Sequence, residues 1–157
     1  MSDINTIRTI LQDNRVIAMV GLSDKPYRPS FFAASYLLEY GYEIIPVNPM
    51  CDSILGQKSY PDLQSVDKPV DIVDCFRRPQ EMPELARQAV AMQARVLWMQ
   101  LGIQNAEARD IAHNGGLQVV ENRCTKIEHG RLYGGLGYAG VNTRVISASR
   151  LKSRPHR

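Results

Sequence analysis

The sequence contains no apolar run that approaches the roughly 20 residues of a membrane span. It also begins without the charged and apolar regions of a secretory signal peptide. Its three cysteines, Cys51, Cys75 and Cys124, are widely separated and form neither a C-x-x-C pair nor a zinc-type cluster with histidine. These absences predict a cytoplasmic protein, in which thiols stay reduced, with no metal site.

An excess of charge of one sign is missing as well. The chain has 19 Lys and Arg against 16 Asp and Glu, a formal net charge of +3. So small an excess indicates neither a nucleic-acid nor a membrane partner. Several of the cations lie in the segment 144–157, which we interpret as a basic, frayed tail. We expect residues 1–143 to form one domain, since 157 residues of which 44% are hydrophobic suit a single core.

Two common nucleotide-binding motifs do not occur. Gly21 is followed by Leu-Ser-Asp-Lys-Pro, with no second or third glycine, so the G-x-G-x-x-G fingerprint of dinucleotide-binding proteins is absent. The P-loop pattern G-x-x-x-x-G-K-[ST] is absent too. A nucleotide site in this chain therefore requires another kind of phosphate-binding turn.

The clearest feature that is present is a strand, a turn and a helix at residues 16–40. Five apolar residues, 16–20, run into Gly21, which is typical of a strand buried on both faces. After a short loop, Pro29 suits the first turn of a helix and Ser30 suits its cap. Backbone N–H groups and the positive end of the helix dipole favour phosphate at such a turn. The alternative is an ordinary strand-to-helix turn with no ligand.

Strands and helices alternate along the rest of the chain. Strands are predicted at 16–20, 43–47, 70–76, 95–99 and 117–121, and helices at 3–13, 30–40, 80–93 and 105–114. Asp3 and Asn105 are the expected caps of two of these helices. We expect the segment 50–69 to be a loop with one short helical turn, and residues 125–143 show no clear periodicity. The alternation predicts an α/β, Rossmann-like fold, with a parallel sheet of about five strands and helices on both faces.

Polar and cationic residues follow each predicted strand. They are Ser23, Lys25 and Arg28 after the first, Asn48 after the second, Arg77 and Arg78 after the third, Gln100 after the fourth, and Arg123 after the fifth. Because ligands bind in such folds at the carboxyl ends of the strands, we expect these residues to share one edge of the sheet. The bias toward arginine and lysine favours a phosphorylated ligand.

The residue after the second strand bears on the choice of nucleotide. NAD enzymes carry a carboxylate there for the ribose 2′-OH, whereas this chain has Asn48 followed by Pro49. An uncharged amide can bind a ribose or a base without repelling a nearby phosphate. This disfavours NAD and leaves NADP or a 3′-phosphorylated nucleotide such as coenzyme A (CoA).

Five motifs occur together over roughly residues 5–130. They are Val-Gly-Leu-Ser-Asp-Lys-Pro-x-Arg-Pro-Ser at 20–30, Ile-x-Pro-Val-Asn-Pro at 44–49, Val-Asp-Ile-Val-Asp-x-Phe-Arg at 70–77, Trp-x-Gln-Leu-Gly at 98–102 and Asn-Arg-Cys at 122–124. In combination they resemble the small CoA-binding protein family, the single-domain relatives of the CoA-binding domain of the succinyl-CoA synthetase alpha subunit. The glycine-rich loop of that ligase domain is replaced here by Ser-Asp-Lys-Pro-Tyr-Arg-Pro.

The resemblance implies a Rossmann-like domain that binds CoA or acyl-CoA. It implies that the nucleotide phosphates lie among Gly21, Ser23, Lys25, Arg28 and Pro29. It also implies that Asn48, Phe76 and Arg77 lie near the adenosine portion, with residues 98–102, Gln100 among them, further along the same cleft. These assignments come from the resemblance alone.

Catalytic residues are harder to find. The chain has no Ser/His/Asp order that suggests a triad, and Cys124, beside Arg123 and Lys126, is the one candidate nucleophile. We favour a packing thiol there over a reactive one, and a mixed disulfide with the thiol of CoA is a hypothesis. We expect His129 to be a surface histidine and not a phosphocarrier.

The sequence therefore favours a non-catalytic CoA-binding or acyl-CoA-binding module over an enzyme. Two alternatives stay open: an NADP-linked oxidoreductase or redox sensor, and an acyl-CoA ligase component that acts with a partner. The sequence also leaves open whether the chain forms a homodimer or binds another protein.

Overall fold

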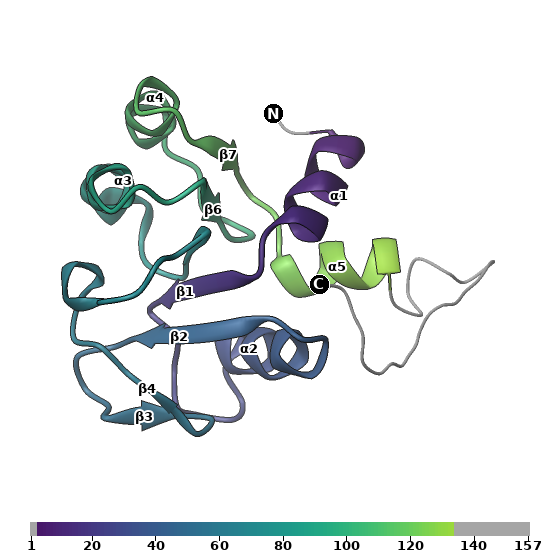
Figure 1. Cartoon of the computed structure of the whole chain (residues 1–157), viewed down its shortest axis with the longest axis vertical. Helices are drawn as coiled ribbons and strands as arrows, with labels where there is room; N and C mark the ends of the chain where they lie inside the picture. Colours follow the sequence, from purple (N-terminus) through teal and green to yellow (C-terminus); the bar gives the residue numbers. More distant parts are fainter. Residues whose placement is uncertain (1–2, 134–157) are drawn as a thin grey trace.

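A five-stranded parallel sheet in the order β2-β1-β5-β6-β7 forms the centre of the fold (Figure 1). The computed structural model describes residues 3–133. The strands of this sheet are β1 (Val16–Val20), β2 (Glu43–Val47), β5 (Ile72–Cys75), β6 (Val96–Met99) and β7 (Gln118–Val120). Every neighbouring pair in the sheet is parallel, which confirms the predicted Rossmann-like α/β class.

Helices cover both faces of the sheet. They are α1 (Ile4–Asp13), α2 (Pro29–Glu39), α3 (Met82–Ala91), α4 (Ala106–Asn114) and α5 (Thr125–Tyr133). The α1 and α2 helices pack on one face and α3 and α4 on the other, while α5 lies against α1 and α2 (Figure 1). Along β1, Ile17 and Met19 face the first pair of helices, and Ala18 and Val20 face the second. Burial on both faces explains the unbroken apolar run of this strand.

The strand order produces a topological switch between β1 and β5. The chain leaves β1 on one side to form β2 and returns to β5 on the other side of β1. In open α/β sheets such a switch leaves a crevice at the carboxyl ends of the two strands, where ligands bind. Here the two ends are Gly21, after β1, and Phe76, after β5.

The helix caps follow the sequence at two places and depart from it at a third. The Asp3 and Asn105 side chains each accept a backbone N–H bond of 2.8 Å in the first turn of α1 and α4, as predicted. The predicted cap at Ser30 is wrong. The N-cap of α2 is Arg28, and the Ser30 hydroxyl instead accepts a bond of 3.0 Å from the Ser23 N–H. Ser30 therefore braces the loop before the helix.

Two elements were not predicted from the sequence. A small hairpin, β3 (Ser53–Ile54) and β4 (Gln57–Lys58), lies in the segment expected to be a loop, next to the predicted short helical turn, η1 (Leu63–Ser65). The second is α5, in the segment that shows no clear periodicity. Its buried residues include Thr125, Glu128 and His129, so the inward face is polar and the usual apolar signal of a helix is missing.

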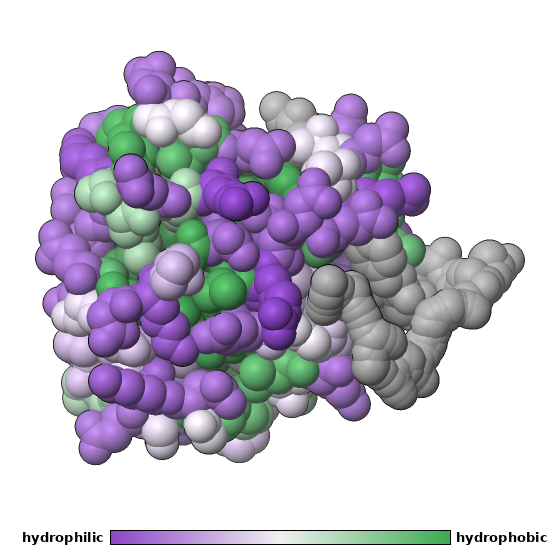
Figure 2. Space-filling view, viewed as in Figure 1, coloured by the Kyte–Doolittle hydropathy of each residue, from purple (hydrophilic) through white to green (hydrophobic). Residues whose placement is uncertain are grey.

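The surface shows no broad apolar face in the orientation of Figure 2, where apolar side chains form small patches between hydrophilic ones. Among residues 3–133, no helix has both the length and the apolar character needed to cross a membrane. The predicted tail, 144–157, and the predicted domain boundary at residue 143 lie outside the described residues.

Gly21 brings the end of β1 into direct contact with the end of β5. Its φ is +88°, and a Cβ built on it would lie 2.7 Å from the Phe76 carbonyl oxygen and 2.8 Å from Cδ of Arg77. The Gly21 N–H also donates a bond of 3.0 Å to the Val47 carbonyl at the end of β2. A side chain at this position would therefore strain the backbone and separate the strand ends.

We expect Gly21→Ala to lower the free energy of unfolding by about 2–4 kcal/mol, through the strained φ and the clash with the Phe76 carbonyl. Gly116→Ala is the matched control, because its φ is +90° but nothing lies within 4 Å of its Cβ position. It should cost only about 1–2 kcal/mol. Urea denaturation measures both, and equal losses would contradict the close contact at Gly21.

Candidate functional site

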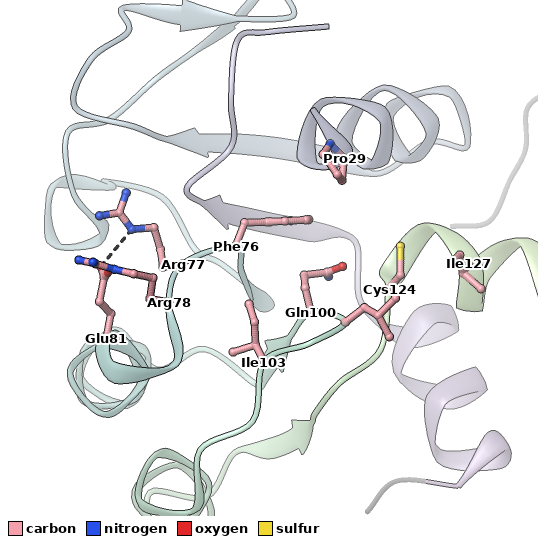
Figure 3. Close-up of a pocket in the computed structure, with 10 residues that line it drawn as sticks. Pro29, Phe76, Arg77, Arg78, Glu81, Gln100, Ile103, Cys124 and Ile127 are labelled. Atoms are coloured by element: carbon pink, nitrogen blue, oxygen red, sulfur yellow. Dashed lines mark hydrogen bonds and ion pairs between the residues drawn. The ribbon is translucent and has the colours of Figure 1, made fainter. Parts of the chain in front are cut away.

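A cavity of about 730 Å³ opens beside the carboxyl ends of β5 and β6. Its lining residues are Pro29, Phe76, Arg77, Arg78, Glu81, Gln100, Leu101, Ile103, Cys124 and Ile127 (Figure 3). In Figure 3, Arg77, Arg78 and Glu81 gather at one end of the cavity, and Cys124 and Ile127 at the other, with Phe76 and Gln100 between them. The volume falls within the range of about 300–1,000 Å³ that is usual for small-molecule sites.

Two arginines share one carboxylate at the cationic end. Nε of Arg77 lies 3.0 Å from Oε1 of Glu81, and Nε of Arg78 lies 3.3 Å from Oε2. Burial alone would raise the pKa of Glu81, but the hydrogen bonds from the two guanidinium groups outweigh it and lower the pKa. The group keeps a net positive charge and guanidinium donors beyond these two bonds, which suits an oxyanion.

The turn after β1 lies directly against this end. The aliphatic part of the Arg77 side chain packs directly against Gly21, with Cδ 2.8 Å from the position that a Cβ would take. The Arg77 side chain therefore lies next to the turn. The turn is held by its own bonds: the Lys25 N–H donates to the Ser23 hydroxyl at 3.0 Å, and the Arg28 N–H donates to the Lys25 carbonyl at 3.0 Å. The Lys25 and Arg28 side chains are exposed and are not among the described residues that line the cavity.

The structure thus brings four of the predicted site residues, Pro29, Phe76, Arg77 and Gln100, together in one cavity, and their contact with a ligand stays a prediction. Gly21 lies beneath Arg77, and the other predicted loop residues, Ser23, Lys25 and Arg28, lie on the turn that leads into Pro29. Sequence reasoning assigned no ligand role to Glu81, Ile103 or Ile127. It singled out Arg78 by its position at the end of a strand, and Leu101 by its place in the motif at 98–102.

Asn48 makes structural contacts at the end of β2. Its Nδ2 donates to the Leu22 carbonyl at 2.9 Å, and its Oδ1 accepts from the Met50 N–H at 2.8 Å. The amide therefore ties the end of β2 to the turn after β1. Its contact with an adenosine group stays a prediction.

A buried polar cluster lies behind the cavity wall, around Asp74. Nε2 of Gln100 donates to Oδ1 of Asp74, and the Thr125 hydroxyl donates to Oδ2 at 3.2 Å. Asp74 is fully buried, and its partners across the sheet are Met19 and Trp98. Burial raises the pKa of Asp74 to about 7, although the bonds from Gln100 and Thr125 act to lower it.

This cluster connects the cavity to α5. Gln100 lines the cavity, and Thr125, the first residue of α5, follows Cys124. Asp74 stands in the motif at 70–77, but one acidic residue in an apolar strand does not by itself predict a buried polar cluster. Cys124 is half-buried and reaches the cavity, while its reactivity stays a prediction.

The expected surface position of His129 is wrong. His129 is 1% exposed and lies among aromatic rings, with its Nδ1 2.9 Å from the Tyr36 hydroxyl. The rings of Tyr40 and Tyr42 are centred 5.0 and 5.6 Å away. Burial lowers the pKa of His129 to about 4. A neutral His129 therefore fixes α5 on α2, on the same face of the sheet as Asp74.

Residues 15–130 match the family described as CoA binding domain. The chain belongs to this CoA-binding family. It is 42% identical, over 123 residues, to the uncharacterised protein YneT of Bacillus subtilis (strain 168), a match that covers 78% of this chain and 91% of YneT. The recognised resemblance to CoA-binding proteins is thereby confirmed.

Solved structures that are similar to this chain include a protein of similar length and one part of a larger enzyme. A hypothetical protein from Pyrococcus horikoshii OT3 is 40% identical with a TM-score of 0.81, covering 83% of this chain and 92% of that chain. The dinucleotide-forming acetyl-coenzyme A synthetase 1 of Ca. Korarchaeum cryptofilum is 24% identical, with a TM-score of 0.64. That match covers 73% of this chain and 27% of the synthetase, so this likeness concerns the fold of one part of a longer protein.

Asp74 and His129 should give the free energy of unfolding opposite dependences on pH. Because the pKa of Asp74 is raised in the folded state, its stabilising contribution to the free energy of unfolding is present near pH 4 and is lost as the pH rises through about 7. A lowered folded pKa means that the contribution of His129 is present above pH 6.5 and is lost as the pH falls through about 4.

We therefore expect Asp74→Asn and His129→Gln to be mirror images between pH 4.5 and 6.5. Relative to the wild type, the stability of Asp74→Asn should rise with pH by about 1.4 kcal/mol per unit, and that of His129→Gln should fall by a similar amount. Urea denaturation across this range measures both slopes, and each variant is the control for the other. Parallel profiles for both variants would contradict the assignment.

Proposed function

We propose that this protein is a non-catalytic binding module for CoA or acyl-CoA, with the nucleotide phosphates held at the turn between β1 and α2. The observation that carries the proposal is the contact between Gly21 and the Arg77 side chain, whose Cδ lies 2.8 Å from the Cβ position of Gly21. It joins the phosphate-type turn to the cavity at the topological switch, where the ligand of an α/β sheet binds. Membership of the CoA-binding family supports CoA as that ligand.

Phosphate binding is supported by the charges that surround this turn. The exposed cations Lys25 and Arg28 lie on the turn, and Arg77 reaches it from β5. The N-terminus of α2, with Pro29 as its first residue, adds the positive end of a helix dipole. A diphosphate carries enough negative charge to engage several of these groups at once.

The remaining parts of the ligand extend to either side of this turn. We place the adenosine portion near Asn48 and Phe76, and the pantetheine arm along the cavity past Gln100. A neutral Asn48 in place of a carboxylate is compatible with a 3′-phosphate on the ribose. In the cavity wall, Glu81 accepts hydrogen bonds from both arginines and Gln100 is bonded to Asp74, which favours binding over proton transfer.

The ligand class can be tested by thermal unfolding with four nucleotides. A ligand at a hundredfold excess over its Kd stabilises the folded state by about 2.7 kcal/mol, which should raise the melting temperature of a chain of this length by about 5–10 °C. We expect CoA to do so, 3′-dephospho-CoA to do less, and NAD to do little. A rise in melting temperature with NADP and none with CoA would contradict the proposal and favour an NADP-linked oxidoreductase or redox sensor.

The phosphate position can be tested with single arginine variants. We expect Arg28→Ala and Arg77→Ala each to weaken CoA binding about 10- to 150-fold, because each removes a charge-assisted hydrogen bond to phosphate worth about 1.5–3 kcal/mol. Arg87→Ala is the matched control, since Arg87 is an exposed, ion-paired arginine on α3. Titration calorimetry with unchanged affinity for Arg28→Ala and Arg77→Ala would move the phosphates away from this turn.

A further inference from the structure

The two ends of the cavity differ in chemistry. One end carries the guanidinium groups of Arg77 and Arg78 with Glu81. The other end carries the aliphatic side chain of Ile127 and the Cys124 thiol (Figure 3), and Leu101, next to Gln100 in the turn after β6, adds a second aliphatic side chain to the lining. A molecule that fills the whole cavity should therefore be anionic at one end and apolar at the other.

Two side chains of the apolar end are unusually exposed. Leu101, in the turn after β6, is 64% exposed, and Ile127, on α5, is 37% exposed. Both line the cavity, so an apolar group placed there would bury surface that now faces water. The gain grows with the apolar area that is buried.

No lysine or arginine is among the described residues that line this end of the cavity. Lys126 is next to Thr125 in sequence but holds its ammonium group 5.4 Å from the centre of the Tyr36 ring. Arg131 pairs with Glu128 at 3.4 Å. Neither cation is among the described residues that line the cavity. The amide nitrogen of Gln100 is directed at Asp74 and Thr125 behind the wall. A carboxylate placed here would lose hydration with no lysine or arginine among the lining residues at this end.

We propose that the apolar end receives a short, uncharged acyl group, so that the ligand is an acyl-CoA thioester bound in preference to free CoA. This inference rests on the proposed function, because it takes the phosphates of the same ligand to lie at the turn after β1 and the pantetheine arm to run past Gln100. The thioester then lies between Gln100 and Cys124, and the acyl chain contacts Leu101 and Ile127. No bond is made or broken in this binding.

A matched pair of thioesters tests the chemistry of the acyl group. Butyryl-CoA and succinyl-CoA both carry four-carbon acyl groups, which end in a methyl and in a carboxylate. By titration calorimetry on the full chain, we expect butyryl-CoA to bind about 4- to 15-fold more tightly than acetyl-CoA, from two further methylenes that are half to fully buried. Succinyl-CoA should bind no more tightly than CoA. Equal affinities for butyryl-CoA and succinyl-CoA, or for acetyl-CoA and butyryl-CoA, would overturn the inference.

Surface variants locate the acyl group without disturbing the core. Leu101→Ser and Ile127→Ser should each reduce the advantage of butyryl-CoA over CoA, measured as the ratio of the two affinities, at least threefold. Ile4→Ser is the control, because Ile4 is also exposed, at 49%, but lies on α1 outside the cavity lining. An unchanged advantage in both cavity variants would overturn the placement.

The same titrations separate the two proposals. If CoA binds and the acyl-CoA thioesters all bind with the same affinity as CoA, the acyl inference fails and the proposed function stands. If neither CoA nor any acyl-CoA binds, the proposed function fails and takes this inference with it.

Discussion

The close approach of the turn after β1 to the end of β5 is the constraint on which this edge of the sheet depends. Gly21 allows it, because a Cβ there would lie 2.7 Å from the Phe76 carbonyl oxygen. With no side chain in between, the stem of Arg77 can cross the turn, and the turn itself is bonded to the end of β2 through Gly21 and Asn48. Three strand ends are therefore held at one place, and the cavity opens beside them.

A second constraint acts from behind the cavity. A fully buried carboxylate is costly unless hydrogen bonds compensate for its lost hydration. Asp74 obtains them from Gln100, at the end of β6, and from Thr125, at the start of α5. His129 lies four residues after Thr125 on the same helix and is bonded to Tyr36 on α2. Two polar contacts thus fix α5, and with it Cys124 and Ile127, against the rest of the fold.

These two sets of contacts explain why one end of the cavity is charged and the other apolar. The β5 end contributes charge, because the residues after the strand are arginines paired with Glu81 in the first turn that follows. The β6 end and α5 contribute aliphatic groups, because Gln100 and Thr125 point inward to the buried cluster. The same residues that stabilise α5 in this way leave an apolar wall on the side of the cavity.

The sequence by itself determined the sheet, its buried strands and the identity of the turn at Gly21. Those features depend on local patterns: unbroken apolar runs, a glycine at a strand end, and caps such as Asp3 and Asn105. It also placed Arg77, Arg78 and Gln100 at one edge, because the carboxyl ends of parallel strands coincide.

Only the tertiary structure decided the rest. The inward face of α5 is made of Thr125, Glu128 and His129, so no apolar periodicity marks it, and its position depends on partners about 50 to 90 residues away in the sequence. The same holds for Asp74, whose burial and raised pKa arise from strands and a helix that the linear pattern does not bring together. The chemistry of the cavity walls was undetermined for the same reason: side-chain direction at strand ends and in loops is set by long-range contacts and not by local sequence.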